Sequence, residues 1–436
     1  MITASLPSRS AFCFLLFATS LIAAQEQPIQ NNEREIARGM LTDVKYDIKS
    51  NYYDPKFHGV DLDSRYKQAS DYISKATSLN QALGAIAWFM EGFNDSHTVF
   101  LPPPRPFVIE QGWRMQMIGE NCYVTAVKPG SDAEKKGLSA GDQVLKINGL
   151  VPTRADLHKI QYLFLALRPQ PGLELLVRSP NQEERTLDIA FQIRETRRII
   201  EPGRDIWDEI REWQKGRSLY QRRSVAVGDT IVWKLPTFAV DEKAADAMIG
   251  DSMKYRSMVI DLRGNGGGSV ETLLHLMRHF FDHGVKVANV QTRAKTEPQT
   301  AKTRNPLFSG PLIVLIDSQS ASASEIFARV MQLEKRATVF GDRSAGAVME
   351  AQIYPHHLGL AYMVSYASEV TSANLVMTDG NSLENVGVLP DVEQLPAAED
   401  LRSNRDPVLA SALALLGQRI TPEEAGKFFP PLWRED

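Results

Sequence analysis

The chain has few cysteines. Its 436 residues contain only 2, Cys13 and Cys122, and Cys13 lies in an N-terminal segment that we expect to be removed. A mature chain with Cys122 alone excludes an intramolecular disulfide, even in an oxidising compartment. Cys122 stands in a strand-like run, so we expect it to be a small buried apolar residue.

The chain also lacks an excess of either charge. It carries 49 Lys and Arg against 53 Asp and Glu, which gives a net charge of -4. This balance provides no basic surface of the kind that binds nucleic acid, so no nucleic-acid partner is expected. Hydrophobic residues make up 43% and charged residues 23%, as in ordinary globular proteins. The length allows two or three domains.

The apolar run near the N-terminus is short. It covers residues 11–22, whereas a membrane-spanning helix needs about 20 apolar residues. It follows Arg9 and ends at Ala23 and Ala24, an arrangement that is typical of a secretory signal peptide. We therefore expect residues 1–24 to be a signal peptide, and the mature chain to be secreted or periplasmic without a stable membrane anchor.

The residue pattern changes along the rest of the chain. Residues 25–103 are predicted to form a helical region, because residues 33–53 and 62–93 carry helical spacing. Residues 104–196 combine short apolar runs with Gly, Pro and Asn turn signals, which predicts a β-rich domain inserted after the helices.

From residue 197 onward, strands and helices are expected to alternate. A polar helix over residues 204–217 leads into this part. Strands are expected over residues 230–233, 258–262, 312–316 and 338–340, and helices over residues 271–281 and after Ser322. Such alternation predicts a mainly parallel sheet with helices packed on it, and hence an α/β core over residues 197–436.

The most informative segment is Ser320-Ala-Ser322-Ala-Ser-Glu325, between a predicted buried strand and a predicted helix. A serine at such a turn exposes its hydroxyl at the strand end, where a nucleophile is most useful. The unpaired N–H groups and the positive dipole end of the helix favour a developing negative charge there. Ser322-x-x-Glu325 also matches a capping box, and this pattern alone favours the structural interpretation.

A glycine-rich stretch, Asp261-Leu-Arg-Gly264-Asn-Gly-Gly-Gly268, also follows a predicted buried strand and precedes a predicted helix. Its glycines permit backbone conformations that are closed to other residues. The N–H groups are therefore candidates for a phosphate cradle or an oxyanion hole, with a plain tight turn as the alternative. The stretch lacks the Lys-Ser/Thr ending of a P-loop and the spacing G-x-G-x-x-G, which disfavours phosphate binding.

Two further polar segments are candidates for contributing side chains to an active site. Asp95-Ser96-His97-Thr98 lies between apolar flanks, where we expect a helix to end and a strand to begin. Residues 378–387, which include Glu384, form a turn-rich loop. By itself this loop is typical of a solvated surface.

Three histidines raise the alternative of a metal site. His275, His279 and His283 lie four apart on a predicted helix, and residues at this spacing can share a metal. No Glu accompanies them as in the motif His-Glu-x-x-His, so an exposed helical face is the favoured interpretation. We therefore expect no metal and no other cofactor.

Taken together and in their order along the chain, the four segments around Ser96, Gly264, Ser322 and Glu384 resemble those of the C-terminal processing and tricorn-core proteases, a superfamily of serine peptidases. The resemblance runs from about residue 35 to the C-terminus, and residues 104–196 resemble the family's PDZ domain. It implies an α/β fold with a crotonase/ClpP-like core and a mainly parallel sheet. An N-terminal helical region and an inserted, β-sandwich-like PDZ domain complete the expected architecture.

The resemblance implies that Ser322 is the nucleophile. In the processing-protease branch the general base is a lysine, but Ala347 stands at the matching position, which excludes a Ser–Lys dyad there. The tricorn-like branch uses a histidine in a Ser-His pair and a glutamate from a late loop, which Ser96, His97 and Glu384 match. His97 is therefore expected to be the general base, oriented by Glu384 either through Ser96 or through another hydroxyl.

The PDZ resemblance implies that peptide C-termini bind by strand addition and by capture of the carboxylate. The capture loop matches Gly112-Trp113-Arg114-Met115, where Arg114 replaces a usual second glycine. Arg114 either strengthens carboxylate binding through a charge-assisted hydrogen bond or crowds the loop.

The resemblance thus implies a serine endopeptidase that cleaves unfolded or C-terminally exposed polypeptides by a Ser-His-Glu mechanism. The expected oxyanion-hole donors are the N–H groups of Ala323 and of Gly266 or Gly267. One alternative is a catalytically inactive, PDZ-containing peptide-binding protein, and another is a small-molecule hydrolase with the PDZ domain as a lid. The oligomeric state is left open, a homo-oligomer included.

Overall fold

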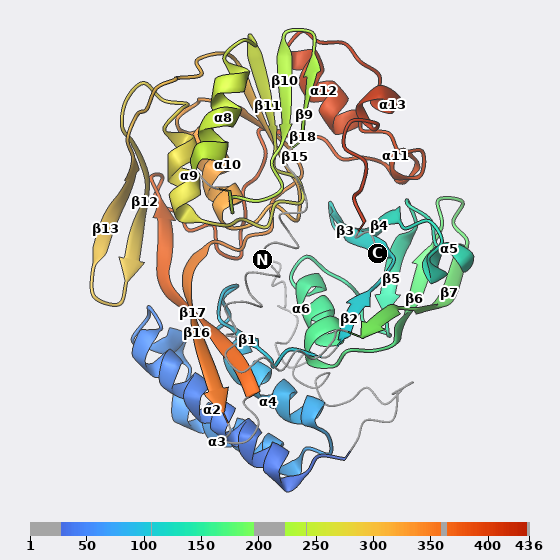
Figure 1. Cartoon of the computed structure of the whole chain (residues 1–436), viewed down its shortest axis with the longest axis vertical. Coiled ribbons are helices and arrows are strands. Elements are labelled where there is room, and N and C mark those ends of the chain that lie inside the picture. Colours follow the sequence, from blue (N-terminus) through green and yellow to red (C-terminus); the bar gives the residue numbers. More distant parts are fainter. Residues whose placement is uncertain (1–27, 106, 196–222, 241, 359–363, 434–436) are drawn as a thin grey trace, which may run out of the picture.

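The computed structural model describes residues 28–105, 107–195, 223–240, 242–358 and 364–433. The predicted signal peptide and the predicted helix over 204–217 lie outside these residues. Figure 1 shows three parts along the chain: blue helices at one end, a cyan and green β-rich part, and an α/β part at the other end. None of the helices in the described residues is long and apolar enough to cross a membrane.

The N-terminal part is helical, as its spacing predicted. It consists of α2 (Asn31–Asn51), α3 (Leu62–Lys75) and α4 (Leu79–Glu91). The pattern over residues 62–93 predicted one helical stretch, but the side chain of Ser78 accepts the N–H of Gln81 and starts α4 as a separate helix. Strand β1 begins at Val99, so residues 95–98 form the helix-to-strand turn that the sequence predicted.

The β-rich part is an antiparallel sheet. Its strands follow the order β3 (Trp113–Ile118), β4 (Asn121–Val127), β5 (Gln143–Ile147), β6 (Gly172–Arg178) and β7 (Glu184–Ala190), with α5 (Asp132–Lys135) and α6 (Leu157–Tyr162) inserted. Strand β2 (Phe107–Glu110) pairs with β8 (Gln192–Glu195), which brings the two ends of the insertion together. Cys122 is buried and unpaired, as predicted, and burial raises the pKa of its thiol to about 12.

The core of the α/β part is a six-stranded sheet in the order β18-β15-β14-β11-β10-β9. Its strands are β9 (Arg223–Val227), β10 (Thr230–Lys234), β11 (Ser257–Asp261), β14 (Leu312–Ile316), β15 (Thr338–Gly341) and β18 (Val392–Glu393). All neighbouring pairs are parallel except β9 with β10. The prediction of a mainly parallel sheet within an α/β fold is therefore confirmed.

Helices cover both faces of this sheet (Figure 1). One hydrophobic cluster joins one face to α8 (Glu242–Ser252), α9 (Val270–Met277) and α10 (Ala323–Leu333). A second cluster joins the other face to α12 (Pro407–Leu415), near α11 (Ala398–Arg402) and α13 (Pro422–Ala425). Successive strand residues point to opposite faces, so Met258 belongs to the first cluster and Val259 to the second.

A second sheet, which the sequence did not predict, connects the helical part to the core. It has the order β1-β17-β12-β13, with β16 paired to β17. Its strands are β1 (Val99–Leu101), β12 (Val285–Thr292), β13 (Thr296–Ala301), β16 (Met349–Leu358) and β17 (Val364–Met377). Because β17 pairs with both β1 and β12, it fixes the turn before β1 relative to the core.

Candidate active site

Ser322 lies between β14 and α10, at the turn that the sequence singled out. It is the N-cap of α10 and has φ 55° and ψ -118°, a conformation that costs a non-glycine residue about 1–3 kcal/mol. Ser322 and Glu325 are arranged as a capping box, yet the hydroxyl of Ser322 makes no capping hydrogen bond. The structural and the nucleophilic interpretations of this segment are therefore compatible, since Glu325 takes the capping role.

Glu325 is fully buried below this turn and accepts four hydrogen bonds. Its Oε2 accepts the N–H groups of Ser322 (3.0 Å) and Ala347 (2.9 Å). Its Oε1 accepts the N–H of Gly346 (2.7 Å) and the hydroxyl of Ser344 (2.6 Å). Burial raises the pKa of this carboxyl to about 7, against the lowering effect of the donors. Glu325 thereby ties the start of α10 to the segment that carries Ala347.

One peptide group joins the nucleophile turn to Glu384. The carbonyl of Ala347 accepts the N–H of Ser322 (2.9 Å). The N–H of the same peptide group belongs to Val348 and donates to Oε2 of Glu384 (2.8 Å). The position where the processing branch carries its lysine side chain thus contributes a backbone connection here.

Glu384, Ser96 and His97 form a hydrogen-bonded relay. The N–H of Ser96 donates to Oε1 of Glu384 (2.7 Å), and the hydroxyl of Ser96 donates to Oε2 (2.9 Å). Oγ of Ser96 also lies 2.7 Å from Nδ1 of His97. Because the single hydroxyl hydrogen points to the carboxylate, Ser96 must accept from Nδ1–H, which leaves the lone pair on Nε2. This is the tautomer that a general base needs.

The turn that carries His97 is held by Asp95. Oδ1 of Asp95 accepts the N–H groups of His97 (3.1 Å) and Thr98 (2.7 Å) and the hydroxyl of Thr371 on β17 (2.7 Å). Desolvation lowers the pKa of His97, although the charge of Asp95 acts in the opposite direction. The imidazole is therefore neutral at neutral pH, as a base must be. Desolvation also raises the pKa of Glu384.

His97 and Ser322 are connected through this network rather than by a direct bond. Among the described residues, no hydrogen bond joins the imidazole of His97 to the hydroxyl of Ser322. Catalytic hydrogen bonds are commonly long without substrate and shorten only when it binds. The connection runs from His97 through Ser96 and Glu384 to the peptide group that holds Ser322.

The glycine-rich stretch passes directly beside Ser322. Gly267 has φ +99°, and a Cβ on it would lie 2.7 Å from Cβ of Ser322 and 3.2 Å from the backbone nitrogen of Ala323. The N–H of Gly267 donates to Oδ1 of Asn265 (2.9 Å), so Gly266 is the favoured one of the two glycine donors. Ala323 is the first residue of α10, and its N–H has no acceptor within the helix. Ala323 and Gly266 remain as candidate donors.

Strand β3, which begins in the predicted peptide-binding segment, contacts the loop that leads to Ser322. The carbonyl of Met115 accepts a hydrogen bond from Nε2 of Gln319 (3.4 Å), and that of Met117 accepts one from the hydroxyl of Ser318. Gly112 has φ +75° and turns the chain into β3, and Trp113 is buried against Phe191. Strand β3 therefore contacts the chain just before Ser322.

Arg114 contacts the C-terminal segment of the same chain. Its guanidinium donates to the carbonyl of Leu432 and lies 5.0 Å from the ring centroid of Trp433. Figure 1 shows this end of the chain beside β3 and β4. The side chain that was considered for carboxylate capture thus already has a polypeptide partner.

The comparisons with known proteins concern the family and the fold of the chain. The sequence model of peptidase family S41 matches residues 231–394, and that of the PDZ domain matches residues 108–167. Through residues 231–394 the chain is thus similar to peptidase family S41. It is therefore a serine-type peptidase, and it carries a PDZ domain.

Among the curated relatives of this chain is the chloroplastic C-terminal processing peptidase of Tetradesmus obliquus. It is 23% identical over 362 residues, which cover 79% of this chain and 74% of the relative. Carboxy-terminal processing protease CtpA of Bacillus subtilis is 22% identical over 348 residues, or 77% of this chain and 69% of the relative.

Solved structures show the same mixed α/β fold. Mature CPAF superposes with a TM-score of 0.63 at 16% identity, over 85% of this chain and 95% of that chain. The photosystem II D1 C-terminal processing protease gives a TM-score of 0.51 at 20% identity, over 83% and 94% of the two chains.

The sequence analysis did not predict two contributions to the site. Glu325 was considered only as a helix cap. Its position in the first turn of a helix, between two apolar segments, could have indicated a buried carboxylate that accepts hydrogen bonds. The connection through Ala347 and Val348 consists of backbone atoms, so no side-chain pattern could have found it.

Proposed function

We propose that this peptidase is a serine endopeptidase with Ser322 as nucleophile and His97 as general base. Glu384 orients His97 through the hydroxyl of Ser96. The observation that carries the proposal is the double role of this hydroxyl, which donates to Glu384 and accepts from His97. A partly buried polar chain of this kind fixes both the tautomer and the ring orientation of the base.

In the proposed reaction, Nε2 of His97 takes the hydroxyl proton of Ser322 as Oγ attacks the scissile carbonyl. The N–H groups of Ala323 and Gly266 stabilise the tetrahedral oxyanion. His97 then protonates the leaving amine, and a water molecule hydrolyses the acyl-enzyme with His97 again as base. Glu384 stabilises the imidazolium in both steps. The proposed reaction uses only protein groups and this water molecule.

We infer that substrates are unfolded or C-terminally exposed polypeptides, held through their C-terminus by the PDZ domain. The proposed binding segment is Gly112, Trp113, Arg114 and Met115, at the start of β3. The contacts of Met115 with Gln319 and of Met117, further along β3, with Ser318 support this inference, because a peptide added along β3 lies beside the loop that leads to Ser322. The names of both curated relatives refer to C-terminal processing.

The remaining organisation is part of the same proposal. Residues 1–24 are a signal peptide, residues 25–103 a helical region, residues 104–196 the β-sandwich-like PDZ domain, and residues 197–436 a crotonase/ClpP-like peptidase core. The mature protein is secreted or periplasmic. A homo-oligomer is compatible with this organisation.

The proposal is tested by incubating an unfolded polypeptide with residues 25–436, as wild type and as Ser322→Ala. Hydrolysis that is present in the wild type and absent in the variant supports a serine nucleophile. Ala347, in place of a lysine base, favours one alternative: a non-catalytic protein that binds peptide C-termini. Absence of hydrolysis in a folded wild type that still binds a peptide C-terminus would establish that alternative.

A further inference from the structure

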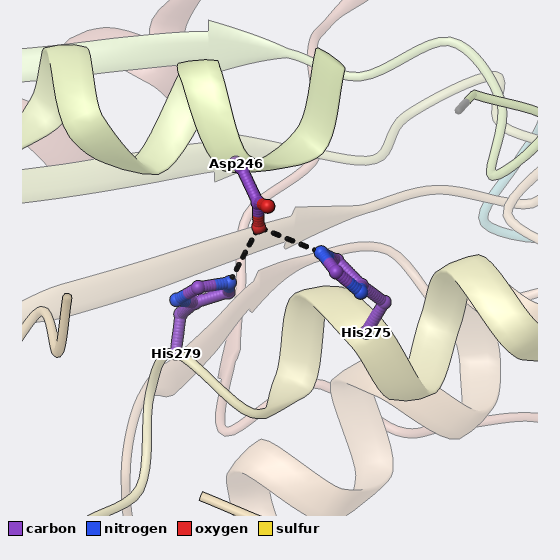
Figure 2. A group of neighbouring side chains, drawn as sticks. All are labelled: Asp246, His275 and His279. Atoms are coloured by element: carbon purple, nitrogen blue, oxygen red, sulfur yellow. Dashed lines mark hydrogen bonds and ion pairs between the residues drawn. The ribbon is translucent and has the colours of Figure 1, made fainter. Parts of the chain in front are cut away.

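Two buried histidines and an aspartate meet away from the active site. Asp246 lies on α8, His275 on α9 and His279 two residues beyond the end of α9. Figure 2 shows the three side chains pointing toward one another from the two segments. The side chains of His275 and His279 are 1% and 0% exposed. The expectation that these imidazoles lie on an exposed helical face is therefore wrong.

The three side chains present their polar atoms to one point. Oδ1 of Asp246 lies 2.7 Å from Nε2 of His275 and 3.2 Å from Nε2 of His279. One ligand atom from each residue lies within 4.8 Å of the others. Two imidazole nitrogens and a carboxylate oxygen are a donor set that zinc binds in proteins.

The other polar atoms of the three side chains are also arranged as in metal sites, where the imidazole nitrogen that does not bind the metal faces an oxygen atom. Nδ1 of His279 lies 2.8 Å from the carbonyl of Pro306. Nδ1 of His275 lies 3.2 Å from Oε1 of Glu242, although no hydrogen bond is made by this nitrogen within the described residues. Oδ2 of Asp246 accepts from Arg304 (3.2 Å), which leaves Oδ1 directed at the histidines.

The contact between His279 and Asp246 requires either a cation between the two residues or a second proton on the imidazole. A carbonyl can only accept, so Nδ1 of His279 carries a hydrogen that it donates to Pro306. In the neutral ring Nε2 then presents a lone pair to Oδ1 of Asp246 at 3.2 Å. Two acceptors do not bind each other, and a cation between them satisfies both. The alternative is a doubly protonated ring in a plain ion pair with Asp246.

We propose that Asp246, His275 and His279 bind one divalent transition metal ion, with Zn²⁺ as the representative ion. Zinc bonds of about 2.0–2.2 Å place the ligands of a tetrahedral site about 3.3 Å apart. The separations of 2.7 and 3.2 Å reach this value with small side-chain movements. His283 is not a ligand, because it is exposed and pairs with Asp282 (2.7 Å).

The proposed ion would join α8 to α9. Helix α9 begins directly after the glycine-rich stretch, at Val270, so the ion would hold the helix that supports one wall of the active site. The metal touches none of the residues assigned to catalysis. The proposal is therefore independent of the proposed peptidase mechanism.

The test is a calorimetric titration of metal-free, untagged protein with ZnCl₂. We expect one ion per chain and a rise in Tm when zinc is in excess, because an ion that binds only the folded chain stabilises it. Loss of an outer partner already weakens metal sites about 10- to 100-fold, so His279→Gln and Asp246→Asn should raise Kd at least about 100-fold. Asp246 is partly exposed, so Asp246→Asn is the variant least disturbing to the fold.

The matched control is His283→Gln, which removes an exposed histidine four residues further along the chain. It should leave zinc stoichiometry and Kd unchanged. Co²⁺ gives an independent measurement, because a tetrahedral site with these ligands produces visible absorption bands. The proposal is overturned if the folded wild type binds no zinc, or if Asp246→Asn and His279→Gln bind zinc as tightly as the wild type does. Those results would establish the plain ion pair.

Discussion

Replacing Ser96 by Ala removes one hydroxyl from the relay and tests its role most sharply. The variant deletes the 2.7 Å contact to Nδ1 of His97 and the 2.9 Å hydrogen bond to Glu384. Hydrogen bonds to charged groups contribute about 1.5–3 kcal/mol, and about 1.36 kcal/mol corresponds to a factor of ten in rate. We therefore expect kcat/KM to fall about 10- to 150-fold.

The assay is hydrolysis of a fluorogenic polypeptide substrate over a range of pH. The loss should fall on kcat rather than KM, because Ser96 contacts the base and not the substrate-binding segment. The acidic limb of the profile should also move to lower pH, since Ser96→Ala separates the imidazolium from the carboxylate that stabilises it. A merely structural role would not move this limb.

Ser365→Ala is the matched control for this variant. Ser365 also lies beside a histidine, with its Oγ 3.0 Å from Nδ1 of His357, but on an exposed part of the β16–β17 hairpin. Its removal should leave kcat/KM unchanged. If Ser96→Ala stays within about twofold of the wild type while its fold is intact, the relay does not orient the base and the reasoning is refuted.

Three further predictions concern the same site. Desolvation lowers the pKa of His97 below its usual 6.5, so kcat/KM should persist as the pH falls through 6.5 and decline only at lower pH; a midpoint above 6.5 would contradict this. Gly267→Ala places a Cβ 2.7 Å from that of Ser322, which is closer than two carbon atoms pack, so Ser322 must shift; a shift of about 1 Å costs about 100-fold in activity, measurable with the same substrate, and unchanged activity would contradict this. Glu325→Gln turns an amide group toward backbone donors, which should lower the free energy of unfolding by about 3 kcal/mol in a denaturant titration; an unchanged midpoint would show that the buried carboxylate is dispensable.

The sequence predicted the helices, strands and turns that a short run of neighbouring residues is enough to identify. The buried run at residues 312–316 and the turn at Ser322 are where the sequence placed them, because a parallel strand covered on both faces leaves an uninterrupted apolar run. The break between α3 and α4 was missed, since the capping serine stands within a longer region of helical spacing. The β16–β17 hairpin was also missed, because half-buried strands give a weaker signal than buried ones.

The site was predictable as far as it depends on side-chain type. The motifs suggested Ser322, His97, Ser96 and Glu384 as a set, and the structure places the last three in hydrogen-bond contact. The hydrogen bond that occupies the N–H of Gly267 depends on backbone geometry and was not predictable.

The burial of His275 and His279 depends on how α8 packs against α9. That packing joins residues about 30 positions apart in the sequence, and helical spacing within α9 gives no information about it. The exposed-face interpretation therefore followed from considering one helix alone.

The most direct test of the central claim is intact-mass analysis after treatment with a fluorophosphonate, which reacts with activated serines. The account predicts one adduct per chain on Ser322, and its loss in the folded variant His97→Gln. An absent adduct on the folded wild type, or labelling that His97→Gln leaves unchanged, would contradict the claim that His97 activates Ser322.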